Sequence, residues 1–124
     1  MQEQQSDDTP LTLGSIIIAT ADPARLKAFY HEVVGIPVNA QGRLVSGGLI
    51  IHPAYHSEVK EAPTEPYRAM LTFDTTDIHA AAARLKARGV VFVREPEREH
   101  WGGWVATFLD PDGNYLQLLQ PAPE

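Results

Sequence analysis

The stretch that decides the fold is ATFLDPDGNYLQLLQ, residues 106–120, in which two apolar runs flank the turn at 110–114. Proline presets φ at the second turn position, aspartate tolerates the third, and glycine or asparagine accepts the left-handed conformation that returns the chain. We therefore predict a β-hairpin. In its second strand, period-two alternation puts Gln117 on the face opposite to that of Leu116 and Leu118. Gln117 is thus a polar residue in the middle of a strand.

Length and composition limit the class of protein. A chain of 124 residues is long enough for one domain with a core and too short for two ordinary ones. Apolar content of 44% and charged content of 21% are typical of a globular protein. No apolar run is long enough to span a membrane, and the N-terminus lacks the basic and apolar parts of a signal peptide. We expect a cytoplasmic protein with no membrane partner.

The absence of cysteine and the acidic net charge limit which metal ligands and which binding partners the protein can have. Without cysteine the chain has no disulfide and no thiolate, so any metal must be held by histidine, carboxylate or amide groups. A formal net charge of −6 disfavours binding to nucleic-acid phosphates. It is compatible with a neutral or cationic small ligand.

The first half of the chain is predicted to contain one strand, one helix and three short strands. After a polar tail at 1–10, which we expect to be disordered, β-branched residues predict a strand at 13–19. Asp22 caps a helix that Pro23 begins and Gly35 ends. The remaining predicted segments are strands at 36–40, 43–46 and 49–54 and a linker at 56–66.

The second half repeats this pattern. Asp77 caps a second helix, and it lies 55 positions after Asp22. The predicted strands of this half are 67–74, 90–94, 104–109 and 115–120. We therefore predict an α+β fold in which one domain at 11–120 contains two βαβββ modules, at 11–55 and 67–120. Each module has one sheet face covered by its helix, and the two bare faces set side by side form a cup.

Two segments carry a resemblance to a known family. They are IATADPARLKAFY at 18–30, followed by Gly35, and WGGWVATFLDPDGN at 101–114. With the internal repeat, they resemble the vicinal oxygen chelate (VOC) superfamily, which includes glyoxalase I, bleomycin-resistance proteins and extradiol dioxygenases. The resemblance covers 11–120 and implies a cup-shaped mixed sheet with helices outside. It also implies a homodimer, with modules paired either within one chain or across two.

The resemblance also implies where a metal would be held. Metal-dependent members usually supply a histidine from the first strand of each half and a glutamate from the last strand of each half. Here the corresponding positions are Ser15, Met70 and Gln117, and the fourth falls near Ile51 or His52. A hydroxyl, a thioether and an amide bring no negative charge to a hard divalent cation. We therefore predict that the metal centre is absent and that no cofactor is bound.

Five further residues are candidates for ligand contacts, namely His52, Asp74, Tyr115, Trp101 and Trp104. His52 lies in an apolar strand, although a lone imidazole without partners is more often a surface residue. Asp74 shares a strand face with Met70, where it is either a base, a partner for a cation, or a solvated strand end. Tyr115 shares the face of Gln117 and suits a ligand oxygen or a subunit contact equally well.

Trp101-Gly-Gly-Trp104 predicts a mobile loop with flat aromatic surfaces that can stack on a planar or cationic ligand. The alternative is that Trp104 belongs to the core and that Trp101 covers a dimer contact. The sequence does not choose between these interpretations.

Two functions remain. The first is a non-catalytic protein that holds a small organic molecule, aromatic or cationic, in a metal-free cup, similar to bleomycin-resistance proteins. The second is a VOC-type lyase, isomerase or dioxygenase that acts on a small oxygenated substrate with an unconventional metal site or none. No catalytic residue is assigned. The predicted ligand-binding residues are Ser15, His52, Met70, Asp74, Trp101, Trp104, Tyr115 and Gln117.

Overall fold

The computed structural model describes residues 10–124 and contains two modules, each with one sheet and one helical segment. The first module comprises β1 (Ser15–Thr20), α1 (Pro23–Ala28), the π-helical turn η1 (Phe29–Val34), β2 (Leu44–Ser46) and β3 (Leu49–Tyr55). The second comprises β4 (Leu71–Asp74), α2 (Ile78–Ala87), β5 (Phe92–Arg98), β6 (Trp104–Leu109) and β7 (Tyr115–Gln120). Nearly all of the tail predicted at 1–10 lies outside the described residues.

The sheets have matching topologies. The first, sheet A, has the order β1-β3-β2, and the second, sheet B, has the order β4-β7-β6-β5. In each, the first strand pairs in parallel with the last strand, and the remaining pairs are antiparallel. This correspondence confirms the predicted α+β fold with an internal repeat.

Aspartate side chains start both helical segments, as the sequence predicts. The Asp22 carboxylate accepts a hydrogen bond from the backbone N–H of Arg25, and the Asp77 carboxylate accepts one from Ala80, both at 3.1 Å. Gly35 ends the first segment with φ +98°, in the left-handed region that favours glycine.

The strand predicted at 36–40 is reduced to one isolated bridge between Val38 and Leu44. Pro37 has no N–H to donate to a ladder. The Asn39 side chain accepts hydrogen bonds from the backbone N–H groups of Gln41 and Arg43, which closes a local turn instead. The first module therefore has three strands rather than four.

Two strands of the second module begin later than predicted. The segment predicted at 67–74 is a strand only over β4, because the backbone N–H of Arg68 donates to Glu65 in a preceding turn. The segment predicted at 90–94 becomes β5, whose register against β6 shifts on either side of Arg94. Both strands of the hairpin, β6 and β7, have the predicted bounds.

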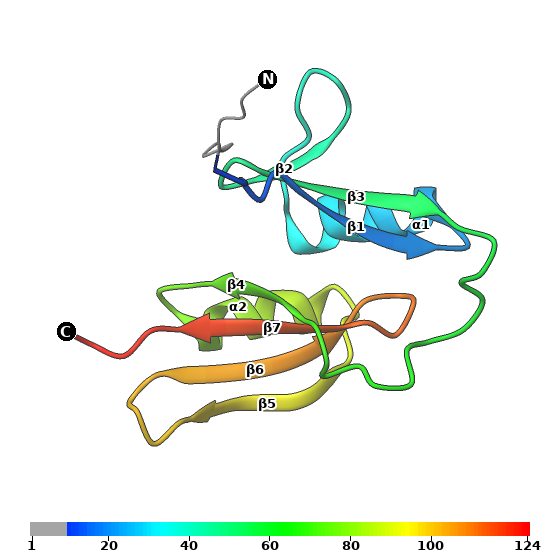
Figure 1. Ribbon diagram of the computed structural model, residues 1–124. Helices are drawn as coiled ribbons and strands as arrows, with labels where there is room; N and C mark the ends of the chain where they lie inside the picture. The colour runs from blue at the N-terminus through cyan, green and yellow to red at the C-terminus, as the bar shows by residue number, and fades with distance from the viewer. Residues whose placement is uncertain (1–9) are drawn as a thin grey trace, which may run out of the picture.

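The helices lie between the two sheets (Figure 1). A shared core joins Leu26 and Tyr30 of the first module to Leu85, Phe108 and Leu118 of the second. Arg84 of α2 and Arg88, which caps the C-terminus of α2, donate to backbone carbonyls at the end of η1. The bare faces of the sheets consequently point away from one another. The sheets do not join within the described chain, so the cup expected from them is not closed by one copy.

The turn at 110–114 links the two modules by hydrogen bonds. Asp110 is buried, and its carboxylate accepts hydrogen bonds from the Tyr30 hydroxyl and the Asn114 amide at 2.8 Å, and from two backbone N–H groups of the turn. The Thr20 hydroxyl donates to Asp112. The turn that reverses the chain thus also anchors β1 and η1 of the other module. Within the described residues, no helix is long and apolar enough to cross a membrane.

Candidate functional site

A row of polar side chains crosses the bare face of sheet B. Strand pairing aligns Thr72 of β4 with Gln117 of β7, Gln117 with Thr107 of β6, and Thr107 with Arg94 of β5. The Gln117 Nε2 atom lies 3.4 Å from the Thr72 hydroxyl oxygen, a long hydrogen bond. Because paired residues project on the same side of a sheet, the four side chains share one face, on which Thr72 is exposed and Arg94 and Gln117 are partly exposed, whereas Thr107 is buried. We call this set the polar row.

Arg94 brings the one positive charge of the polar row. Its Nε atom donates to Glu97 at 2.6 Å, and its Nη2 atom donates to Glu99. These two hydrogen bonds raise the pKa of Arg94, chiefly through Glu97, so the guanidinium stays charged. Its charge is balanced by two carboxylates of its own hairpin.

An aromatic pair lies at one end of the same face. The rings of Tyr115 and Tyr67 meet edge to face, with centroids 4.7 Å apart at 87°. Met70 directly precedes β4, and alternation places it on the side of Thr72. Four predicted residues, Met70, Asp74, Tyr115 and Gln117, are therefore brought to one face. Asp74, at the end of β4, also borders a cleft of about 240 Å³ between the modules.

The two tryptophans lie on different sides of sheet B. Trp104 packs edge to face on His79 of α2, with centroids 4.8 Å apart, and belongs to the layer around the core. It therefore does not contribute to the bare face, contrary to its place among the predicted ligand residues. Trp101 is 46% exposed, and its indole lies directly on Gly103. Of the predicted tryptophan pair, Trp101 is exposed and Trp104 is partly buried.

The remaining predicted residues lie on the bare face of sheet A. Ser15 pairs with Ile50, and His52 pairs with Ile17, whose side chain is 68% exposed. His52 is exposed, whereas Ile51 is buried against the helix side. This face is mainly apolar, in contrast to the polar row of sheet B.

The residues at the family's metal positions do not fit a divalent cation. Ser15 stands on sheet A, while Met70 and Gln117 stand at sheet B, and one chain does not bring them together. Their donor atoms are also unsuited to a hard cation. Within 10–124, no group of three or more histidine, aspartate or glutamate side chains is arranged to hold a metal.

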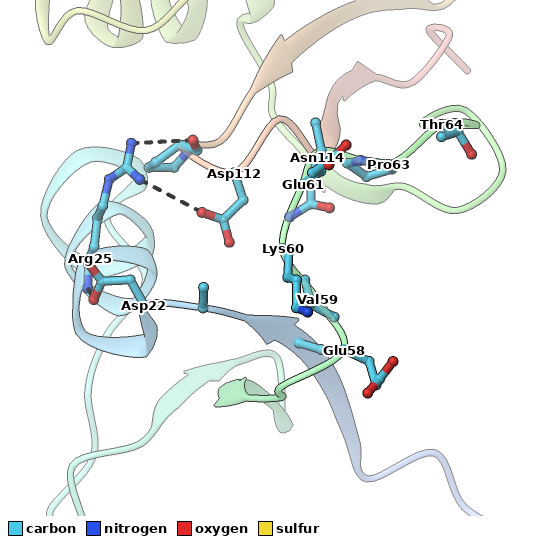
Figure 2. A pocket seen from close by; sticks show the side chains of 14 residues that line it. Asp22, Arg25, Glu58, Val59, Lys60, Glu61, Pro63, Thr64, Asp112 and Asn114 are labelled. Atoms are coloured by element: carbon cyan, nitrogen blue, oxygen red, sulfur yellow. Dashed lines mark hydrogen bonds and ion pairs between the residues drawn. The ribbon is translucent and has the colours of Figure 1, made fainter.

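A separate cleft of about 820 Å³ lies between the linker and the turn at 110–114 (Figure 2). Arg25 forms one wall, where it contacts Asp112 at 4.0 Å and donates to the Pro111 carbonyl at 3.3 Å. Glu58 and Lys60 of the linker form the opposite wall. None of the predicted ligand residues lines this cleft, and the linker sequence gave no sign of it.

Sequence reasoning missed several members of the bare face of sheet B. Thr72 and Thr107 could have been found, since simple alternation within their strands places them beside Gln117. Arg94 could not, because the register shift in β5 decides which way its side chain points.

Comparison with known proteins agrees with this fold. Residues 12–118 match the family model of the Glyoxalase/Bleomycin resistance protein/Dioxygenase superfamily. The uncharacterized protein YetH of Bacillus subtilis (strain 168) is 26% identical over 121 residues, which cover 87% of this chain and 97% of that protein.

Two solved structures share the fold. A glyoxalase/bleomycin resistance protein/dioxygenase from Nocardioides superimposes with a TM-score of 0.76 at 18% identity, covering 94% of this chain and 87% of the other. A glyoxalase/bleomycin resistance protein/dioxygenase family enzyme from Burkholderia phytofirmans PsJN gives 0.74 at 20% identity, covering 89% and 98%. The family match over most of the chain, together with the repeated modules, shows that this protein belongs to the Glyoxalase/Bleomycin resistance protein/Dioxygenase superfamily.

Proposed function

We propose that the protein binds a small organic molecule, without transforming it, in a cup formed by two copies of the chain. Sheet A of one copy supplies an apolar wall, and sheet B of the other supplies the polar row. The observation that carries the proposal is the polar row itself, in which Thr72 and Gln117 present accessible hydrogen-bonding groups. Within residues 10–124, no cluster of side chains is arranged to hold a metal beside them.

The direction of the two bare faces supports a second copy. Because the helices lie between the sheets, sheet A and sheet B of one chain cannot cover the same ligand. The bare face of sheet A exposes Ile17 and also carries Ile50 and Ala54. Covering such a face with another chain is favourable by about 25 cal/mol per Å² of apolar surface removed from water. A cyclic dimer gives each bare face one partner.

The strand edges support the same arrangement. Among residues 10–124, β1 pairs only with β3, and β4 pairs only with β7, so in the described part of the chain each sheet ends in a first strand with a free edge. Free edges readily pair with strands of another chain. At its other edge, β5 of sheet B has register shifts, Pro96 and several charges, which discourage such pairing. We infer that β1 of one copy lies along β4 of the other.

In such a cup, the ligand's polar atoms face Gln117 and Thr72, and its apolar part faces sheet A. Trp101 stands near one end of this face and reports on occupancy. We expect small aromatic ligands to quench tryptophan fluorescence saturably and to be recovered unchanged after incubation. Recovery of a chemically altered compound at catalytic protein concentration would contradict the proposal and favour an enzyme of the same family.

A further inference from the structure

We propose that Glu97 and Glu99 set the charge selectivity of the sheet B face. By holding Arg94, they leave the polar row without a free positive charge, so it accepts uncharged or cationic ligands and rejects carboxylates and other anions. This inference rests on the proposed function, because it concerns the ligand of the same face.

The Arg94 guanidinium and the carboxylates of Glu97 and Glu99 lie together at one end of the polar row. Arg94 is aligned with Thr107 in the middle of the sheet, and its side chain is only about one-third exposed. Glu97 contacts it from the same strand, and Glu99 contacts it from the turn that follows. The Glu99 side chain is 24% exposed against 60% for Glu97, so Glu99 is the more shielded of the two partners.

The charges on this face then favour neutral or positive ligands. One guanidinium and two carboxylates sum to a net charge of −1. Among the strand-paired positions on this face, Arg94 is the only basic residue, and Asp74 adds a carboxylate aligned with Leu119. An anion entering here would lose its water without meeting an unpaired cation, which is costly in a covered site.

Uncharged ligands do not face this cost. A guanidinium carries five N–H donors, and the two glutamates occupy the Nε donor and one donor on Nη2. The donors that remain can bind a ligand carbonyl oxygen without any change in the net charge of the cluster. An amide or ketone next to an aromatic body therefore suits both Arg94 and Gln117.

Three probes with the same ring test the inference: 2-naphthamide, 2-naphthoate and 2-(aminomethyl)naphthalene, which are neutral, anionic and cationic at pH 7. For the wild-type protein, we expect the dissociation constant of naphthoate to be at least about tenfold higher than those of the other two, since an unpaired buried charge costs that much or more. In E97Q/E99Q, Arg94 is freed, so naphthoate should bind at least about tenfold more tightly, while naphthamide changes little.

The variant E58Q/E95Q is the matched control. It changes the net charge by the same amount, but Glu58 lies on the linker and Glu95 pairs with Lys86. Naphthoate should bind it as weakly as it binds the wild type. Thermal unfolding of both variants checks that the fold is retained.

The possible outcomes separate this inference from the proposed function. Naphthoate binding the wild type as tightly as naphthamide, or no gain in E97Q/E99Q over the control, overturns the inference and leaves the binding function standing if naphthamide binds. If no probe binds the wild type, the proposed function and the acceptance of uncharged and cationic ligands are both contradicted, even where E97Q/E99Q gains naphthoate binding. Absence of binding by every variant contradicts both.

Discussion

The Tyr30 hydroxyl donates to the buried Asp110 carboxylate and thereby joins the helix of one module to the hairpin turn of the other. Tyr30 itself is fully buried. Burial, followed by the charge of Asp110 and the hydrogen bond to it, raises the pKa of Tyr30 above its ordinary range. The phenol therefore stays protonated in the folded protein at any ordinary pH.

Replacing Tyr30 with phenylalanine should lower the free energy of unfolding at pH 7 by about 1.5 to 3 kcal/mol, as expected for a hydrogen bond to a charged group. The contribution of Tyr30 is fully present below its unfolded pKa of about 10 and is lost as the pH rises above it, because the unfolded chain then ionises. The gap between wild type and Tyr30→Phe should therefore shrink by about 1 kcal/mol between pH 10 and 11.

Urea unfolding at each pH measures this gap. Tyr55→Phe serves as the control, since Tyr55 is 65% exposed and its loss should change stability by less than about 0.5 kcal/mol at pH 7. A gap at pH 7 no larger than that of the control would contradict the role of Tyr30 in joining the modules.

Gln117 is the position at which the predicted absence of a metal site can be tested. Gln117→Glu supplies the carboxylate that metal-dependent relatives use at this position, but Ser15 and Met70 remain unsuitable. We expect neither the wild type nor Gln117→Glu to bind Mn²⁺, Ni²⁺, Zn²⁺ or Fe²⁺ stoichiometrically at micromolar affinity after treatment with a chelator. Calorimetry checks this, and a tight site in either protein that depends on residue 117 would refute it.

Among the elements, the loop between β5 and β6 is shaped by the contact of Trp101 with Gly103. A methyl group added at Gly103 would lie 1.8 Å from a carbon of the Trp101 ring, so the ring must move. Gly102, with φ +95°, and the hydrogen bond from Glu99 N–H to the Gly103 carbonyl complete the turn. The Trp101 indole thus packs on a glycine of the same loop, which the sequence predicts to be mobile.

Gly103→Ala should displace the Trp101 indole into water and shift its fluorescence emission to longer wavelength, with a loss of stability of about 1 kcal/mol. Gly14→Ala is a suitable control, because an added methyl group at Gly14 meets no atom within 4 Å. An unchanged emission maximum in Gly103→Ala would mean that the ring does not rest on the glycine in solution.

The helices and strands also show which parts of the fold can be predicted from the sequence. The hairpin and both helix starts follow from local signals, namely the turn residues at 110–114 and the capping carboxylates of Asp22 and Asp77. The strand predicted at 36–40 failed because Pro37 and the side-chain hydrogen bonds of Asn39 outweigh its apolar pattern. The face to which Trp104 belongs follows from the same alternation that places Thr107 on the opposite side, whereas the side of Arg94 depends on the register shift in β5.

For the whole molecule, the decisive feature is the placement of both helices between the sheets. The periodic patterns predict which face of each sheet its own helix covers, but not how the two modules pack. That packing depends on contacts far apart in sequence, such as Tyr30 with Asp110 and Arg84 with the Val34 carbonyl. As a result, the bare faces of one chain diverge, and the proposed cup requires two chains.

The measurement that tests this cup most directly is the binding of 2-naphthamide, by equilibrium dialysis, to a mixture of two blocked variants. Ala54→Phe fills the apolar wall of sheet A, and Gln117→Phe removes the centre of the polar row on sheet B. Each variant alone should bind no probe. In a cross-chain dimer, a mixed pair has one cup with both faces intact, so an equilibrated equal mixture should recover about one quarter of the wild-type sites. If wild-type protein binds the probe but the mixture recovers none, the cup is not shared between chains.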